Sequence, residues 1–538
     1  MTTLKTRRGV SLLAVIAVAA GAAAVPGIAT AAPSASAFGV VATAERLPSL
    51  VDLDTSKTGS ITIHKLVKDA TNGTTEGTGL EDSTVTGTPL DGAKFTVERL
   101  TNVDLTTQAG WEKLVGFNGD VTAAKADGVD AAVEKTTAGG GLATFSNLPL
   151  GAYVVTETES PAGYVGSKPF IITVPMTNPK DLNKWVYDVH AYPKNSKAGV
   201  EKTVADVATP AIGSAISYTI KSDVPAVEAL DFYDVVDQYD KRVELPEAGI
   251  TLKLINGKNG EVALTKGTDY KLIGATGTDG KTMFWTAEFT EAGRKKIVEN
   301  RKDDTTKVQM DLAGTVKEKV ESDGLFKNKA ILLPNAPSNG WTPGSGEVPP
   351  PDYPNSEVVS KFGKVKITKV SAADTSAKLK GAEFEVYQCT PQSTPTKNFD
   401  SVDATLDTKL SPAGVTTYVT DANGEVTIDG LRNNDWANNA EVKEADRGWY
   451  CLVETKAPEG FELQTRPIAF QVLQTNSTKD NEYTLATTVK DVPHNGGFNL
   501  PLTGAAGVGV LIGAGALLVG GSGAIALANK RRKEQADA

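Results

Sequence analysis

The sequence predicts an all-β protein built from β-sandwich domains in a row. Short segments rich in β-branched and aromatic residues recur along the chain and are bounded by Gly, Asn, Asp or Pro. The 52 Gly and 27 Pro among 538 residues are consistent with many turns, and long helical periodicity is scarce. The length corresponds to roughly three or four domains. Strands are expected, among other places, at residues 61–63, 153–156, 170–174, 365–368 and 470–473.

Composition restricts the function classes that the chain can serve. Hydrophobic residues make up 40%, charged residues 22% and aromatic residues 6%, which suits a globular protein and excludes collagen-like, disordered and polytopic membrane proteins. A net charge of -10 disfavours non-specific nucleic-acid binding, so no nucleic acid is expected as a partner. With 2 Cys and 3 His, neither a metal, a cofactor nor a His-dependent triad is expected. The histidines are scattered and are expected to be structural or surface residues: His64, His190 and His494.

The start of the chain has the pattern of a secretory signal peptide. Lys5, Arg7 and Arg8 form a charged region, an apolar stretch covers residues 10–25, and residues 29–31 have the small-x-small pattern of a cleavage site. The alternative is an uncleaved membrane anchor, but small residues follow and no stop-transfer pattern does. Export places the chain in an oxidising compartment, where disulfides are permitted.

The end of the chain carries three contiguous features. A pentapeptide is followed by an uncharged apolar run over residues 505–528, long enough to span about 30 Å of hydrocarbon as a helix. A basic cluster at residues 530–533 follows and is expected to stay on the cytoplasmic side. This order resembles the sorting signal of Gram-positive surface proteins, in which a sortase cysteine cuts between Thr and Gly and holds the Thr as a thioester. A plain single-pass anchor is the alternative. The pentapeptide consists of Leu500, Pro501, Leu502, Thr503 and Gly504.

Three sequence blocks occur twice in the same order, which indicates two copies of one domain type. They frame a stretch, roughly 196–340, that lacks them and therefore belongs to a different sandwich variety. A Pro/Gly/Ser-rich segment over residues 333–355 is expected to join the middle and last domains as a stiff spacer. The paired blocks are residues 59–66 with 363–370, 90–95 with 379–384, and 153–164 with 450–461.

The repeated blocks resemble the CnaB-type immunoglobulin-like domains of Gram-positive pilins, and the middle stretch resembles their CnaA-type domain. Together with the two ends, the resemblance covers nearly the whole chain and is closest to a major shaft subunit of actinobacterial fimbriae. It implies tandem immunoglobulin-like β-sandwiches between a signal peptide and a C-terminal sorting helix. The expected ranges are a signal peptide at 1–31, a CnaB-like domain at 32–195, a CnaA-like domain at 196–340, a Pro-rich connector at 341–358, a second CnaB-like domain at 359–499 and the sorting signal at 500–538.

Residues 185–194 resemble the pilin motif, in which Trp, Val, Tyr, Pro and Lys recur at this spacing, although Ala191 stands where a second Val is usual. The resemblance makes Lys194 the nucleophile that attacks the thioester on Thr503 of the next subunit, and the product is an amide. The alternative is one exposed lysine among many. Attack requires an uncharged amine, whereas a lysine with a pKa near 10.4 is almost wholly protonated at neutral pH, so the sortase must take up a proton or the dock must desolvate the amine. The motif residues are Trp185, Val189, Tyr192, Pro193 and Lys194.

Pilin domains of this kind often join a Lys to an Asn or Asp inside the domain, assisted by a buried acid. Burial lowers the pKa of Lys and raises that of Asp or Glu, so the pair can sit as a neutral amine and a protonated acid. The acid then polarises the target carbonyl while the amine attacks it, and no separate enzyme is needed. The alternative for each candidate set is an ordinary strand lysine and a salt-bridged acid.

The resemblance assigns such a set to each of the last two domains. In the last domain the lysine is Lys369 and the acid is Glu454, and the third partner should lie on the last strand. Asp491 is our choice because it shares one face with residues 483, 485, 487 and 489 by the period of two, although Asn495 remains an alternative. The middle-domain set consists of Lys202 as the amine, Asp234 as the acid and Asn328 as the amide.

The first domain offers Lys65, Glu157 and Asp188 for a third set. The resemblance implies that first domains often lack the bond, so a crosslink is not expected there. Cys389 and Cys451 both lie in the last domain, and an even count in an exported chain favours a disulfide over two buried free thiols.

The sequence therefore favours a structural, non-enzymatic shaft subunit of a cell-wall-anchored fimbria that supports adhesion. The alternatives are a monomeric wall-anchored adhesin or minor pilin, and a wall-anchored hydrolase, for which the sequence offers no P-loop, G-x-S-x-G or H-E-x-x-H motif. The expected partners are identical subunits, a pilus-specific class C sortase, a housekeeping sortase, peptidoglycan, minor pilins and a host or bacterial receptor that the sequence does not identify.

Overall fold

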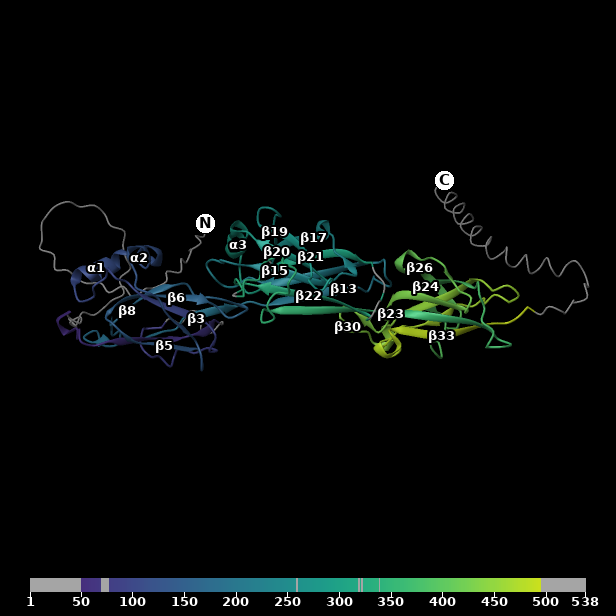
Figure 1. The fold of residues 1–538 in the computed structure, drawn as a ribbon, viewed down its shortest axis with the longest axis horizontal. Helices are drawn as coiled ribbons and strands as arrows, with labels where there is room; N and C mark the ends of the chain where they lie inside the picture. The colour runs from purple at the N-terminus through teal and green to yellow at the C-terminus, as the bar shows by residue number, and fades with distance from the viewer. Residues whose placement is uncertain are drawn as a thin grey trace, which may run out of the picture.

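The chain forms three β-sheet bodies that lie in a row and give an elongated molecule (Figure 1). The computed structural model describes residues 50–68, 77–257, 260–317, 320, 323–337 and 339–494. The expected all-β fold class is confirmed. The signal-peptide and sorting-signal predictions, including Asn495 and the apolar run at 505–528, fall outside the described residues. Among the helices that are described, none has the length and apolar character needed to cross a membrane.

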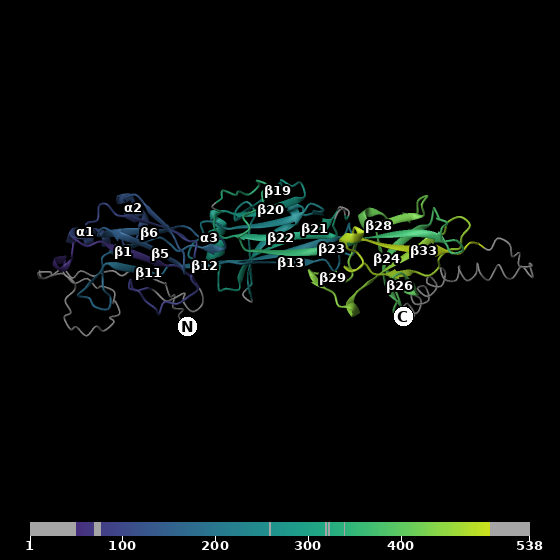
Figure 2. The ribbon, with the colours of Figure 1, turned by 60° about the horizontal axis from the view of Figure 1, so that its bottom comes forward.

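The first body packs two sheets, in the orders β11-β1-β5 and β4-β3-β6-β8, around one core. Burial alternates along β1, so that Ile61 and Ile63 enter the core while the residues between them face outward. A small third sheet, β2-β12-β7, lies at the end next to the middle body (Figure 2). The strands are β1 (Gly59–His64), β2 (Leu66–Lys68), β3 (Lys94–Arg99), β4 (Val133–Thr136), β5 (Leu142–Leu148), β6 (Gly151–Glu159), β7 (Tyr164–Val165), β8 (Phe170–Val174), β9 (Met176–Thr177), β10 (Trp185–Val186), β11 (Asp188–Ala191) and β12 (Lys194–Lys197).

The middle body is a second sandwich with a large continuous core. One sheet has the order β13-β14-β21-β17-β18 and the other begins β19-β20-β15-β22. Its strands are β13 (Val200–Ala205), β14 (Ala215–Asp223), β15 (Asp234–Asp240), β16 (Val243–Glu244), β17 (Ile250–Asn256), β18 (Glu261–Ala263), β19 (Tyr270–Thr276), β20 (Thr282–Phe289), β21 (Thr306–Val316) and β22 (Leu325–Leu333).

The third body repeats the sandwich arrangement around its own core. One sheet joins β28 and β33 to β23, and the other has the order β25-β32-β31-β24-β26. Its strands are β23 (Asn355–Ser371), β24 (Glu383–Pro391), β25 (Asp400–Ser401), β26 (Ala404–Leu410), β27 (Tyr418–Val419), β28 (Glu425–Arg432), β29 (Trp436–Ala437), β30 (Ala440–Glu441), β31 (Trp449–Lys456), β32 (Ile468–Phe470) and β33 (Thr484–Asp491).

Strand β23 connects the middle and last bodies without a break. Its first half, Asn355 to Lys361, pairs with β22 of the middle body, and its second half pairs with β28 and β33 of the last. The expected stiff spacer is therefore not a free linker, because Trp341 and Tyr353 are buried against the middle body and its end is already strand. The middle and last bodies therefore share strand β23, which contributes to a sheet in each of them.

Within the described residues, three short α-helices interrupt the strands, and each begins at a side-chain cap that satisfies a free backbone N–H. Thr107 caps α1 (Gln108–Gly116), Asp120 caps α2 (Val121–Asp127) and Thr290 caps α3 (Glu291–Glu299). The first two lie on the first body, where Trp111 and Ala124 anchor a small separate core. The strand expected at residues 470–473 overlaps the observed strand β32 only at Phe470, where β32 ends.

Candidate functional site

The pilin-motif residues serve different structural purposes along one segment. The Trp185 ring on β10 lies against the Trp111 ring of α1, with centroids 5.8 Å apart, and Val189 on β11 is fully buried in the core of the first body. Tyr192 follows β11 on its outward side and stacks on His64. Lys194 is the first residue of β12 and is half-buried. The motif therefore anchors its front half in the core and brings its lysine to the junction with the middle body.

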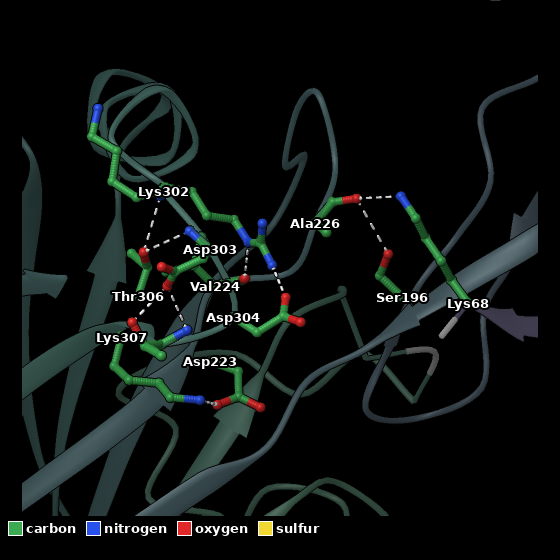
Figure 3. Close-up of polar contacts among 12 residues, drawn as sticks. Lys68, Ser196, Asp223, Val224, Ala226, Lys302, Asp303, Asp304, Thr306 and Lys307 are labelled. Carbon is green, nitrogen blue, oxygen red and sulfur yellow. Dashed lines mark hydrogen bonds and ion pairs between the residues drawn. The ribbon is translucent and has the colours of Figure 1, made fainter. Parts of the chain in front are cut away.

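Strand β12 is held at both ends. The Leu66 N–H donates to the Pro193 carbonyl at 3.1 Å, which starts the parallel pairing of β12 with β2. Beyond Lys194, the Lys68 ammonium and the Ser196 hydroxyl both donate to the Ala226 carbonyl, a backbone oxygen of the middle body, at 3.0 and 3.5 Å (Figure 3). These contacts fix the lysine-bearing strand against its neighbour.

On the middle-body side of this junction, charged side chains form an ion pair and hydrogen bonds to the backbone. Asp223 at the end of β14 accepts a hydrogen bond from the Lys307 ammonium at 2.5 Å (Figure 3). It also accepts one from the Gly199 backbone N–H at 2.8 Å. The Arg301 guanidinium donates to the Val224 carbonyl at 2.8 Å. The segment that follows β12 is thus hydrogen-bonded to Asp223 at Gly199, two residues after the strand ends at Lys197.

In the last body, the structure places Lys369, Glu454 and Asp491 in contact. The Lys369 ammonium lies 2.8 Å from a Glu454 carboxylate oxygen and also contacts Asp491, and all three side chains are essentially fully buried. Lys369 is on β23 and Asp491 ends β33, so the contact joins the first and last strands of this body. Burial alternates along β33 as expected, with Val489 and Asp491 facing inward.

Burial raises the pKa of the Glu454 carboxyl, and the nearby Lys369 and the Gln464 backbone N–H oppose that rise. The Phe384 ring lies under the Lys369 ammonium, 5.2 Å from it. The amine, the acid and the Asp491 carboxyl thus meet in a dry site, as amide formation requires.

In the middle body, the expected acid is wrong. Lys202 on β13 contacts Asp237, not Asp234, and both side chains are fully buried. Because residues three apart on a strand point to opposite faces, Asp234 leaves the main core while Asp237 enters it beside Tyr239. The local pattern had fixed the strand but not which of its two aspartates faces the lysine.

Asn328 completes this set as expected in position. It lies on β22 opposite Tyr239 of β15 and is 1% exposed. Its amide nitrogen and oxygen have no hydrogen-bond partner among the described residues, but its proximity to the Asp237 carboxyl opposes the rise in that pKa. Burial nevertheless raises the pKa of Asp237 overall and lowers the pKa of Lys202. The site therefore favours a neutral amine next to a protonated acid.

In the first body, Lys65 and Glu157 meet, but Asp188 does not join them. Asp188 accepts instead from the Ser60 hydroxyl at 2.7 Å on the exposed side of the sheet. The third residue is Asn195, whose amide donates to Glu157 at 2.5 Å while the Lys65 ammonium donates to the other Glu157 oxygen at 2.7 Å. Sequence reasoning missed Asn195, although it directly follows the motif lysine.

Glu157 differs electrostatically from the other two acids. Burial alone would raise its pKa, but Lys65, Asn195 and the Ser167 N–H outweigh burial and hold that pKa below its ordinary value. The Ser160 hydroxyl also donates to it, at 2.9 Å. Burial lowers the pKa of Lys65 to about 8. This site is built to keep its carboxylate ionised.

The two cysteines form the expected disulfide. Cys389 on β24 and Cys451 on β31 are bonded, with Cα atoms 5.8 Å apart and a sequence separation of 62. Both are buried in a small core with Val402 and Ala469. The alternative of two free thiols is wrong.

Family models match two parts of the chain. Residues 56–196 match the N-terminal domain D1 of Gram-positive pilin subunits, and residues 363–486 match a prealbumin-like fold domain. The fimbrial subunit type 1 of Actinomyces viscosus is 40% identical over 549 residues, covering 99% of this chain and 99% of that one.

Solved structures show the same architecture. The fimbrial protein FimP from Actinomyces oris is 36% identical, with a TM-score of 0.53 over 82% of this chain and 99% of that one. The full-length major pilin SpaD from Corynebacterium diphtheriae is 30% identical, with a TM-score of 0.59 over 82% of this chain and 99% of that one.

Proposed function

This chain belongs to the Gram-positive pilins and is a shaft subunit of a surface pilus, and we propose that an amide between Lys194 of one copy and the Thr503 carbonyl of the next joins the subunits. Its partners include identical subunits. The observation that carries the proposal is the fixed position of the lysine. Lys194 opens a strand that is bonded to β2 on one side and to the middle body at its far end.

The linking step balances as an acyl transfer. The Lys194 nitrogen forms a bond to the Thr503 carbonyl carbon, the carbon–sulfur bond of the sortase thioester breaks, and the thiolate leaves. The amine must first lose a proton, which the sortase takes up. No cofactor takes part, and the energy of the cleaved Thr503–Gly504 peptide bond is carried through the thioester.

We propose two internal amides, one in the middle body and one in the last. Lys202 attacks the Asn328 side chain with Asp237 as the assisting acid, and one ammonia leaves. Lys369 attacks the protonated Asp491 side chain with Glu454 as the assisting acid, and one water leaves. Support comes from complete burial of both sets and from the raised pKa values of Asp237 and Glu454, which favour the protonated acid.

For the first body we propose an uncrosslinked ion pair. Its assisting acid would have to be protonated to polarise the Asn195 carbonyl, whereas the hydrogen bonds to Glu157 hold its pKa low. The expected ectodomain is therefore lighter than its sequence mass by one ammonia, one water and the two hydrogens of the Cys389–Cys451 disulfide, with no additional loss from Lys65. A second ammonia loss that maps to Lys65 and Asn195 would contradict this assignment.

The internal amides would act mechanically. A fibre one subunit wide carries load through every domain in series, and a non-covalent domain holds by only about 5–15 kcal/mol. Both proposed bonds tie a first strand to a last strand, β13 to β22 and β23 to β33. Pulling on the ends of either sandwich would then load a covalent bond before the core opens.

The remaining parts of the proposal follow from the order of the sequence features. A pilus-specific sortase would polymerise the chain, a housekeeping sortase would attach the fibre to peptidoglycan, and minor pilins and a receptor would complete a fibre that supports adhesion. The signal peptide, the three domain ranges and the sorting signal keep the boundaries given above, with the change that residues 355–358 belong to β23.

The test compares two lysines on one strand. Cells that carry Lys194→Ala are expected to lose the high-mass ladder on a denaturing gel. Cells that carry Lys197→Ala, which removes an exposed lysine from the same strand, are expected to keep it. An intact ladder in the Lys194→Ala cells would exclude the linkage and favour a subunit anchored singly to the wall.

A further inference from the structure

Two of the three histidines, which the sequence led us to expect as structural or surface residues, are hydrogen-bonded to each other beside the pilin motif. His64 ends β1 and His190 lies on the adjacent parallel strand β11, where Thr62 is its register partner. The His64 Nε2 and the His190 Nδ1 are 2.8 Å apart, so one ring donates a hydrogen bond to the other. Both side chains are on the outward face of the sheet, because the residues on either side of His190 are buried in the core.

The pair supports Tyr192, two residues before the linking lysine. The Tyr192 ring stacks on the His64 imidazole, with centroids 4.6 Å apart and planes at 15°. Its hydroxyl accepts a hydrogen bond from the Asp82 backbone N–H at 2.7 Å. Tyr192 is therefore held by stacking of its ring on the His64 imidazole and by the hydrogen bond from the Asp82 N–H to its hydroxyl.

A short strap, defined here as residues 77–85, crosses the same place. The His190 backbone N–H donates to the Gly79 carbonyl at 2.9 Å. Gly77 lies so close to Tyr192 that a Cβ atom there would be 2.7 Å from the ring. The histidines, the tyrosine and the strap thus form one packed unit, and a change in one of them must be accommodated by the others.

The histidine pair keeps its hydrogen bond with one added proton but loses it with two. With a single added proton the facing nitrogens still share one hydrogen, but with both rings protonated two N–H groups face each other at a distance meant for one hydrogen bond. Burial and His190 both lower the pKa of His64, and Glu81 of the strap opposes them. The other titratable group in contact is Tyr192, while the Asp82 and Asp188 carboxylates are bonded to Thr84 and Ser60.

We propose that the His64–His190 pair positions Tyr192, and through it Pro193 and Lys194, for amide formation, and that double protonation of the pair releases the segment. Pro193 transmits the constraint, because its ring fixes one backbone angle and its carbonyl is bonded to the Leu66 N–H. The histidines are positioning residues and do not touch the reacting atoms. The inference rests on the proposed role of Lys194.

The first experiment compares polymerisation rates over a pH range. Purified full-length ectodomain with its pentapeptide is incubated with the pilus sortase between pH 5 and 8, and dimer formation is measured for the wild type, His64→Gln and His190→Gln. Glutamine keeps a hydrogen-bonding side chain but cannot be protonated. The ratio of wild-type to variant rate cancels the pH dependence of the sortase and of the amine. We expect this ratio to fall about tenfold for each unit by which the pH is lowered below the value at which the second proton binds.

A ratio that stays constant over the whole range would overturn the positioning role. Unfolding midpoints of the variants show whether they fold, and His494→Gln is the matched control because His494 pairs with Glu462 on the surface of the last body. Lys194→Ala tests the linkage separately. If this variant still forms dimers, the proposed Lys194–Thr503 amide is wrong, and this conclusion does not depend on the ratio measured for the histidine variants.

A second experiment needs no polymerisation. Proton NMR of the wild-type ectodomain follows the ring signals of His64, His190 and Tyr192 during acid titration. We expect the two histidines to titrate in two separated steps, with the Tyr192 ring signals moving in the second step only. Independent single-step titrations, or Tyr192 signals that do not move, would overturn the inference even if the fibre linkage is correct.

Discussion

The ammonium of Lys202 contacts the carboxyl group of Asp237 in the core of the middle body, where neither side chain is exposed. Asp234, on the same strand, faces the opposite side, and no lysine of the described part of the chain pairs with it. This relationship decides which acid assists the proposed Lys202–Asn328 amide. It also separates two buried aspartates that differ in sequence position by only three residues.

Replacing the assisting acid should prevent the middle-body bond. Asp237→Asn removes the proton that polarises the Asn328 carbonyl, so the intact ectodomain is expected to retain the mass of the ammonia that the wild type loses. Asp234→Asn is the matched control and should lose that ammonia as the wild type does. Intact-mass measurement reads both variants, and an unchanged loss in Asp237→Asn would assign the role to another group.

Asp234 should make the middle body less stable as pH rises. Burial, with Glu288 nearby, raises its pKa from 3.8 to about 8, so the folded state holds a proton that the unfolded state releases between these values. Stability is therefore highest below about pH 4 for this group and falls by up to about 1.4 kcal/mol per pH unit above it. Asp234→Asn should unfold at a higher denaturant concentration than the wild type at pH 8, and the two should converge near pH 4. Parallel pH profiles would contradict the burial argument.

The disulfide should stabilise the last body. In the chain-entropy model, a closed loop of 62 residues corresponds to about 4 kcal/mol. The double variant Cys389→Ala and Cys451→Ala is expected to lower the unfolding midpoint of this body and to increase its cleavage by protease. Reductant should act on the wild type but not on the double variant. Equal midpoints for the two proteins would mean that the crosslinked strands already constrain the loop.

The hairpin of β29 and β30 should lock the middle and last bodies together. Asp206 of the middle body accepts from the Asn438 backbone N–H at 2.6 Å and from the Ser360 hydroxyl at 2.5 Å, and it is fully buried. Asp206→Ala would leave these donors unpaired at a cost of about 1–3 kcal/mol for each buried group. Hydrogen exchange in the hairpin should then accelerate, whereas Val207→Ala, an exposed neighbour, should leave it unchanged. Unaltered exchange in Asp206→Ala would show that β23 alone couples the bodies.

Sequence patterns predicted features that depend on alternation and local composition. The strand at Phe170–Val174 is β8 as expected, and the period of two along β33 identified Asp491 as an inward-facing residue. These features are local, because a strand needs only its own β-branched residues and a regular side-chain period. The disulfide was also predictable, since Cys389 and Cys451 were the only two cysteines available.

Features that depend on register between distant strands were not predictable. Asp234 and Asp237 both suit a buried acid by pattern, and only the pairing of β15 with β20 and β22 fixes the face of each. Asn195 reaches Glu157 because β12 aligns with β2, and His64 meets His190 because β1 aligns with β11. Each of these contacts joins residues far apart in sequence, so no local signal reports it.

The most direct test of the shaft assignment is peptide sequencing of purified fibres after protease digestion. We predict one branched peptide in which the Thr503 carbonyl is bonded to the side-chain nitrogen of Lys194. A branched peptide that joins Thr503 to a different lysine, such as the exposed Lys197 on the same strand, would contradict the account.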